Sequence, residues 1–332
     1  MASRTSRNEA VSQVVADWLA ANPISGSTLV LDDGIGRIAS ELADLGVEAT
    51  TWQRMSAMGP TWLPEGSWDN VILRLPKGKE ALELYVHAVA SRLNKGGRLF
   101  VCGANDEGVK SSSKRIEGVF SDVSTVETRR RCRIFRATNP QSDVRSDLAE
   151  WGVSCADGEL SWTSFPGVFA HGRLDAGTRD LLTRVEDPDP KSRVLDFGCG
   201  AGVVGLEMQR RVPGLTVDLL DIDGLAIEAA RRNLPGCRVI QSDGWEQVRG
   251  ERWDVILSNP PFHDGVARNH EVLDRLVREA PDHLTRGGVL YVVCQRNVPV
   301  MDRLVEVFGD RRSERLHMGR YQVWKAIRSR RL

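Results

Sequence analysis

The sequence carries the same series of motifs twice, and this internal repetition limits the possible fold more than any other feature. Each half begins with a short apolar run that is followed by a glycine-containing stretch and then by a helical pattern. The matching segments of the two halves are residues 29–32 and 193–197, 68–72 and 253–257, and 93–97 and 284–288. Three echoes in the same order predict a duplicated domain.

Each half alternates short apolar strands with helical patterns of about 10–15 residues, which is typical of a parallel sheet covered by helices on both faces. We therefore expect an α/β protein made of two tandem Rossmann-like domains, the first copy being degenerate. Strands of the second half are predicted at 193–197, 217–221, 237–241, 253–258 and 288–294, with a final antiparallel hairpin at 314–318 and 321–327. A parallel core that ends in such a hairpin is a familiar arrangement in methyltransferases.

A polar, turn-rich stretch at residues 139–143 separates the halves, and a short hairpin is predicted around Asp157-Gly158. We expect a degenerate methyltransferase-like domain at 1–140, a linker with the hairpin at 141–165, and a catalytic domain at 166–332.

Composition excludes several classes of protein. No run reaches the roughly 20 apolar residues that span a membrane, and residues 11–21 read as an amphipathic helix rather than as a signal peptide. Six cysteines are scattered without a Cys-x-x-Cys pair, which argues against a disulfide framework and a zinc site and favours the cytoplasm. We expect no bound metal, and a monomer.

The charge balance does not announce a nucleic-acid partner, because 45 basic residues offset 45 acidic ones. Arginines nevertheless cluster within 129–136, and basic residues crowd the C-terminus at Lys325, Arg328, Arg330 and Arg331. Such clusters can bind phosphates. A solvated strand edge and a frayed tail would explain them equally well.

Gly198, Gly200 and Gly202 follow a predicted strand and open a helix, so the backbone can turn tightly and leave room for a ligand. The spacing differs from the dinucleotide fingerprint, in which the third glycine comes three residues after the second. Asp196 precedes these glycines and could accept a hydrogen bond from the amino group of a methionine moiety, or could instead cap the helix.

Two further acids follow the next strands. Asp221 can accept hydrogen bonds from both hydroxyls of a ribose, which also fits a nicotinamide cofactor. Asp243 is placed for the exocyclic amine of an adenine. Ligands of open α/β sheets bind at the carboxyl ends of strands, where all three acids are expected. These positions predict a site for S-adenosylmethionine (AdoMet) that comprises Asp196, Gly198, Cys199, Gly200, Gly202, Asp221, Ile222, Asp243 and Gly244.

The tetrapeptide Asn259-Pro260-Pro261-Phe262 follows the fourth strand and is the most specific signal in the chain. The Asn259 side-chain carbonyl and the Pro260 backbone carbonyl can each accept one N–H of an exocyclic amine. This contact directs the nitrogen lone pair and stabilises positive charge as it develops. Prolines stiffen the segment, and Phe262 offers a face on which a base can stack.

His263 and Asp264 come next and invite assignment as a general base. A methylated amine is acidic enough to lose its proton to water or to the asparagine carbonyl. We therefore expect both residues to shape the loop.

The chain resembles the ribosomal RNA small subunit methyltransferase C family over nearly its whole length. The resemblance rests on the segments 165–169, 174–178, 194–203 and 258–265 and on the doubled fold. It implies transfer of a methyl group from AdoMet to the N2 amine of a guanine in 16S ribosomal RNA, within the small subunit. It also implies that Phe169, Asp175 and Thr178 lie over the methionine end of the cofactor.

The first half departs from the pattern. Ile38 stands where the third glycine is expected, Asp33 crowds the loop, and the tetrapeptide positions become Arg74, Leu75, Pro76 and Lys77. We expect this domain to have lost catalysis and to bind RNA through its new charges, or to be purely structural.

Other functions stay open at this point. A sister group that modifies 23S ribosomal RNA has similar motifs. A protein glutamine-N5 methyltransferase would carry tyrosine after the prolines, and a DNA adenine methyltransferase would carry a target-recognition insertion. A non-catalytic RNA-binding assembly factor would not need the intact motifs of the second half.

Overall fold

A computed structural model describes residues 4–260 and 266–329, which form two units. Unit 1 comprises the chain up to Arg54 together with Leu63–Gly152, and unit 2 comprises Met55–Trp62 together with the chain from Val153 onward. No helix in the described ranges is both long and apolar enough to cross a membrane.

Unit 1 is a six-stranded sheet in the order β2-β1-β3-β4-β6-β5. Its strands are β1 (Thr28–Leu31), β2 (Ala49–Trp52), β3 (Trp68–Arg74), β4 (Leu93–Ala104), β5 (Phe120–Arg129) and β6 (Cys132–Pro140). Its helices are α1 (Arg4–Ala21), α2 (Arg37–Asp44), α3 (Lys79–Ala90) and α4 (Val109–Glu117). The first four strands are parallel, and β6 and β5 add an antiparallel hairpin.

Unit 2 is a seven-stranded sheet in the order β11-β10-β9-β12-β13-β15-β14, preceded by the two-stranded hairpin β7–β8. Its strands are β7 (Val153–Asp157), β8 (Leu160–Ser164), β9 (Arg193–Phe197), β10 (Thr216–Asp221), β11 (Arg238–Gln241), β12 (Trp253–Ser258), β13 (Leu284–Gln295), β14 (Ser313–Met318) and β15 (Tyr321–Ile327). Its helices are α5 (Ala176–Leu182), α6 (Val203–Arg211), α7 (Gly224–Asn233), α8 (Val266–His283) and α9 (Met301–Phe308).

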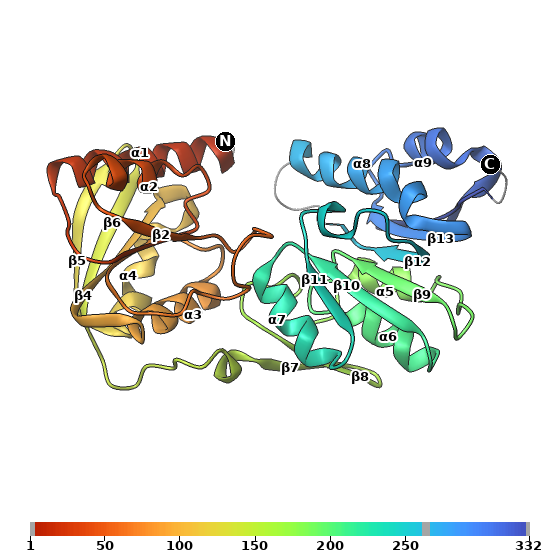
Figure 1. Ribbon diagram of the computed structural model, residues 1–332, viewed down its shortest axis with the longest axis horizontal. Helices are drawn as coiled ribbons and strands as arrows, with labels where there is room; N and C mark the ends of the chain where they lie inside the picture. Colours follow the sequence, from red (N-terminus) through yellow and green to blue (C-terminus); the bar gives the residue numbers. More distant parts are fainter. Residues whose placement is uncertain (1–3, 261–265, 330–332) are drawn as a thin grey trace. The chain divides into compact units, whose positions relative to one another are not determined.

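Helices cover both faces of the sheet in unit 2 (Figure 1). On one face, Leu276 of α8 and Leu304 of α9 pack with Ile256 of the central strand β12. On the other face, Leu181 of α5 and Met208 of α6 pack in a second buried cluster. Because alternate residues of a strand point to opposite faces, β12 contributes apolar side chains to both clusters.

The six strands of the sheet in unit 1 have counterparts in the same order in the sheet of unit 2, which confirms the duplication predicted from the sequence. Unit 2 has one more strand, β11, at its edge beside β10. At the equivalent point of unit 1, after β2, the chain leaves its own unit, and residues 55–62 belong to unit 2. The first copy therefore has a docking loop where the second copy has α7 and β11.

The docking loop, residues 55–62, is held by specific contacts in unit 2. Met55 forms a backbone bridge with Asp223, and Gln241 Nε2 donates to the carbonyl of Ser56 at 2.7 Å. A Cβ atom on Gly224 would lie 2.0 Å from the Thr61 carbonyl oxygen. Only glycine allows α7 to approach the loop this closely.

The observed strands of unit 2 confirm the predicted ones to within a few residues, including the hairpin β14–β15. The hairpin around Asp157-Gly158 is also confirmed, with Gly158 at φ 59°. It is grouped with unit 2, and unit 1 extends to Gly152 rather than to residue 140.

Candidate functional site

A hollow in unit 2 lies at the carboxyl ends of β9 and β12, the edge where ligands of α/β sheets bind. It gathers residues from four separate parts of the chain. Its lining consists of Trp162, Phe169, Ala170, Arg173, Leu174, Asp175, Thr178, Asp196, Gly198, Cys199, Gly200, Ala201, Val203, Val204 and Asn259. The hollow thus brings together eight of the residues that the sequence assigned to the site.

The glycine loop after β9 is shaped to face a ligand. Gly198 and Gly200 have φ of 72° and 53°, and a Cβ atom on either would meet nothing within 4 Å. Their open side is therefore a cradle rather than a packing contact. Gly202 has another role, because a Cβ there would lie 2.8 Å from Leu234 in the packing of helix against sheet. Burial raises the pKa of the Cys199 thiol well above its usual range, so this group stays protonated.

Asp196 is the last polar residue of β9 and is 1% exposed. Its Oδ2 accepts a hydrogen bond from the Gly205 backbone N–H at 3.0 Å. Burial raises the pKa of Asp196 to about 7, and the nearby Asp221 charge adds to this shift. A cationic group in the hollow would favour the ionised form of Asp196, which fits the amino group of a methionine moiety.

Asp221 ends β10 and ties two loops together. Its Oδ2 accepts from the Gly200 N–H at 2.8 Å, and its Oδ1 accepts from the Asp223 N–H at 2.9 Å. Burial and the Asp223 charge raise the pKa of Asp221 to about 6. The carboxylate thus shapes the glycine loop directly.

The remaining residues predicted for the cofactor do not line the hollow: Gly202, Asp221, Ile222, Asp243 and Gly244. The Asp243 carboxylate is exposed and lies 3.3 Å from Arg275 Nη1. A Cβ on Gly244 would touch the same guanidinium at 3.1 Å. Recognition of an adenine amine by Asp243 would therefore compete with this ion pair.

Asn259 follows β12 and reaches across the hollow to the start of α5. Its Nδ2 donates to Asp175 Oδ2 at 3.0 Å and to Thr178 Oγ1 at 2.9 Å. The preceding residue fixes the strand end, because the buried Ser258 hydroxyl donates to the Phe197 carbonyl at 2.8 Å. These bonds place the asparagine side chain beside the glycine loop.

Of the other three residues of the tetrapeptide, the structure describes Pro260 alone. Pro260 is buried. Pro261 and Phe262 lie outside the described residues, as do His263 and Asp264, so the structure places none of these side chains.

Sequence reasoning missed several lining residues. Trp162 comes from β8, and Arg173 and Leu174 come from the turns before α5. The segment between β8 and α5 carries turn signals that include Gly167 and Gly172, both with positive φ. Its proximity to the glycine loop is a long-range contact that no local pattern encodes.

The equivalent place in unit 1 is filled by protein side chains. Arg74 stands at the position of Asn259, is 6% exposed, and donates through Nη2 to the Glu107 carboxylate at 2.6 and 2.7 Å. The same Nη2 donates to Asn8 of α1 at 3.1 Å. Asp33 is also buried and accepts from the Ser12 hydroxyl and the Ile38 N–H.

The hypothesis that Arg74 binds RNA phosphates is therefore wrong. Its charge is neutralised inside unit 1 by Glu107, because a buried guanidinium needs a partner. Lys77 is exposed.

The arginine cluster within residues 129–136 includes exposed side chains. Arg130 and Arg131 form the two-residue turn between β5 and β6, are exposed, and have φ of 50° and 63°. Two positive φ values define a type I′ turn, in which asparagine and glycine are the favoured residues. Of the C-terminal cluster, Lys325 pairs with Glu186 at 2.7 Å, and Arg330 and Arg331 lie outside the described residues.

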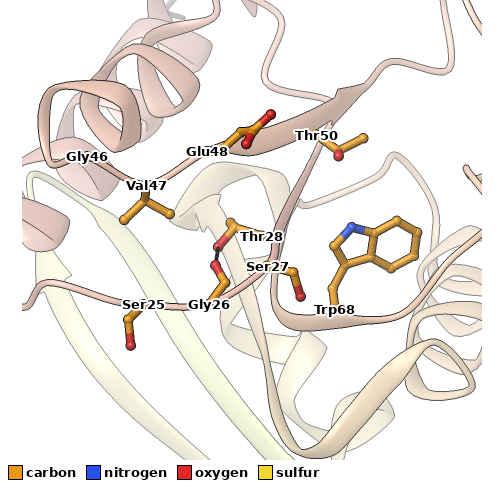
Figure 2. Close-up of a pocket in the computed structure, with 9 residues that line it drawn as sticks. All are labelled: Ser25, Gly26, Ser27, Thr28, Gly46, Val47, Glu48, Thr50 and Trp68. Atoms are coloured by element: carbon orange, nitrogen blue, oxygen red, sulfur yellow. Dashed lines mark hydrogen bonds between the residues drawn. The ribbon is translucent and has the colours of Figure 1, made fainter.

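A hollow in unit 1 lies at the amino ends of its parallel strands (Figure 2). Its walls include Thr28, Thr50 and Trp68, which stand at or near the amino ends of β1, β2 and β3. It is thus not the counterpart of the hollow in unit 2, which lies at the carboxyl ends of the strands.

Comparisons with known proteins agree with this architecture. Residues 159–325 match the methyltransferase small domain family, and residues 43–154 match the methyltransferase small domain N-terminal family. The chain is similar in structure to a T. thermophilus 16S rRNA N2 methyltransferase solved in complex with AdoMet and guanosine, with a TM-score of 0.74 and 23% identity. The superposition covers 96% of this chain and 92% of that protein. That likeness shows the doubled fold.

Curated relatives show the family. The chain is 35% identical over 264 residues, 77% of each chain, to ribosomal RNA small subunit methyltransferase C of Pseudomonas aeruginosa (strain UCBPP-PA14). It is 38% identical over 240 residues, 70% of this chain and 71% of its relative, to the protein of the same name from Pseudomonas entomophila (strain L48). The chain therefore belongs to the ribosomal RNA small subunit methyltransferase C family.

Proposed function

We propose that this protein transfers a methyl group from AdoMet to the N2 amine of a guanine in 16S ribosomal RNA. The observation that carries the proposal is that Asn259 and the glycine loop line one hollow. An amide that can hold an exocyclic amine thus lies beside a cradle suited to the cofactor. AdoMet supplies an electrophilic methyl group on its sulfonium.

The residues of unit 2 divide the work of holding the cofactor. Gly198 and Gly200 leave backbone space for it, and Asp196 offers a carboxylate to its amino group. In this proposal Asp221 accepts hydrogen bonds from ribose hydroxyls while it holds the glycine loop. Phe169 is 44% exposed at this hollow and can cover an apolar part of the bound ligands.

Asn259 acts on the target amine. The lone pair of an aromatic amine is delocalised into the ring, so the nitrogen is a poor nucleophile until its hydrogens are held. The Asn259 Oδ1 and the Pro260 carbonyl accept these hydrogens and stabilise the positive charge that develops on nitrogen. Phe262 stacks on the guanine in this proposal.

RNA is the proposed partner because the relatives are named for ribosomal RNA of the small subunit. The exposed turn Arg130-Arg131 gives unit 1 a cationic tip for phosphates. We place the reaction in the cytoplasm, within the small subunit, and expect a monomer that needs no metal.

The test is methylation with labelled AdoMet. Isolated small subunits, isolated large subunits and the two deproteinised ribosomal RNAs would be incubated with the protein, and the labelled nucleoside would be identified after digestion. We expect label in N2-methylguanosine of 16S RNA. Label in 23S RNA alone, or in a glutamine of a ribosomal protein, would contradict the proposal.

A further inference from the structure

The orientation of the Asn259 side chain is fixed by its nitrogen. Both hydrogens of Nδ2 have acceptors, one in Asp175 Oδ2 at 3.0 Å and one in Thr178 Oγ1 at 2.9 Å. An amide nitrogen has two hydrogens to donate, so these bonds use its full capacity. The carbonyl oxygen Oδ1 has no donor among the described residues and stays available for a ligand.

The two acceptors are themselves held in place. Asp175 is the N-cap of α5, and the same Oδ2 accepts from the Thr178 backbone N–H at 3.0 Å. Thr178 is 7% exposed in the first turn of that helix. Its hydroxyl and the Asp175 carboxylate therefore form a rigid receptor for one end of the amide.

The Asp175 carboxylate sets the orientation of the Asn259 amide. A threonine hydroxyl can donate or accept, so Thr178 alone would tolerate either orientation of Asn259. An ionised carboxylate only accepts, so turning the amide around would place Asn259 Oδ1 against Asp175 Oδ2 with no hydrogen between them. Asp175 thus excludes the reversed amide.

We propose that Asp175 and Thr178 are positioning residues that hold the Asn259 amide with its oxygen free for the target amine. This inference rests on the proposed function of Asn259. It gives both residues a role different from the contact with the methionine end of the cofactor that the family resemblance implied. A reversed Asn259 amide would point its N–H groups at the N–H groups of the target amine, so no hydrogen bond would form and methyl transfer would slow.

The first test compares two substitutions at one position. Thr178→Val removes the acceptor and keeps the shape and the backbone N–H, whereas Thr178→Ser keeps the hydroxyl. With small subunits as substrate, we expect Thr178→Val to lower kcat about 100-fold, because an amide held by Asp175 alone keeps its orientation but loses its exact position, and a misplaced catalytic group typically costs that much. The KM for RNA and the Kd for AdoMet should stay within a few fold, and Thr178→Ser should restore most of the rate. A weakened Kd with normal kcat would show a cofactor contact and overturn the inference.

The second test asks whether Thr178 acts through Asn259. In a double-mutant cycle, Thr178→Val should cost little further rate once Asn259→Ala is present, because the group to be positioned is gone. Additive losses would overturn the inference. Thermal unfolding of each variant serves as the control for folding.

A third measurement is independent of turnover. The Asn259 side-chain NH₂ resonances can be assigned in an amide-labelled spectrum by their loss in Asn259→Ala. We expect both hydrogens to be protected from exchange in the wild type and to lose protection in Thr178→Val and in Asp175→Ser, which keeps the helix cap but shortens the side chain. Unprotected hydrogens in the wild type would refute the inference. Protected hydrogens in a protein that methylates no ribosomal RNA would refute only the proposed function.

Discussion

The ionised Asp196 carboxylate is expected to lower the stability of the folded protein and to strengthen cofactor binding. The substitution Asp196→Asn tests both effects. The carboxyl group is 1% exposed and has one hydrogen bond, from the Gly205 N–H. Asparagine has nearly the same shape and can accept the same bond. The substitution therefore removes the charge and leaves the packing.

The magnitude follows from the pKa of Asp196, which burial raises from 3.8 to about 7. Between these values the folded protein binds a proton that the unfolded chain releases, so the stability contributed by this proton is fully present below pH 3.8. It is lost as the pH rises through about 7. Three units at 1.36 kcal/mol each set an upper value of about 4 kcal/mol. We expect Asp196→Asn to match the wild type near pH 4 and to exceed its unfolding free energy by up to that amount at pH 8.

Binding should change in the opposite direction. The amino group of the ligand is cationic and pairs with an ionised Asp196, so the affinity of the wild type should rise between about pH 6 and pH 8. S-adenosylhomocysteine carries the same amino group and suits calorimetry. We expect Asp196→Asn to bind it at least tenfold more weakly at pH 8, since a charged hydrogen bond contributes about 1.5–3 kcal/mol, and to lose the pH dependence.

Urea denaturation at several pH values, without ligand, measures the stability difference. The exposed Glu314→Gln is the matched control, which removes one carboxylate without changing a buried site. Asp221 also titrates in this range, so the difference between variant and wild type is the informative quantity. Equal stability of the two proteins at pH 8 would refute the claim that burial destabilises the ionised Asp196. Unchanged ligand affinity would refute the contact between Asp196 and the amino group of the ligand.

Three further outcomes are expected. Asn259→Ala should lower turnover about 100- to 1,000-fold and leave the Kd for AdoMet within a few fold, and near-normal turnover would refute the assignment. Gly224→Ala should displace the docking loop, because the new Cβ meets the Thr61 carbonyl at 2.0 Å, and we expect a loss of about 1–3 kcal/mol of stability in urea denaturation. Replacing Arg130-Arg131 by Asn-Gly should stabilise the turn by about 1 kcal/mol and weaken RNA binding, with a salt dependence flatter by about 0.7–0.9 per lost contact. An unchanged salt slope would show that these arginines do not contact phosphates.

The sequence alone determined the strands, the duplication and the glycine loop, because these depend on neighbouring residues. Apolar runs of the right length located β9 and β12, and the glycine spacing marked where positive φ is needed. The tetrapeptide that begins at Asn259 also indicated the chemistry, since its residue types suit one task. Local periodicity and short motifs carry this information directly.

Tertiary structure decided the contacts between distant parts of the chain. Arg74 has the charge of a phosphate ligand in the sequence, but it is buried against Glu107. Residues 55–62 lie inside the range 1–140 that was expected to form the first domain, but they belong to unit 2, where Met55 bridges to Asp223. The pairing of Asn259 with the N-cap of α5 is likewise invisible in either segment alone. Burial and ion pairing depend on which segments meet when helices and loops pack on each sheet, and residue types in a local window do not encode these contacts.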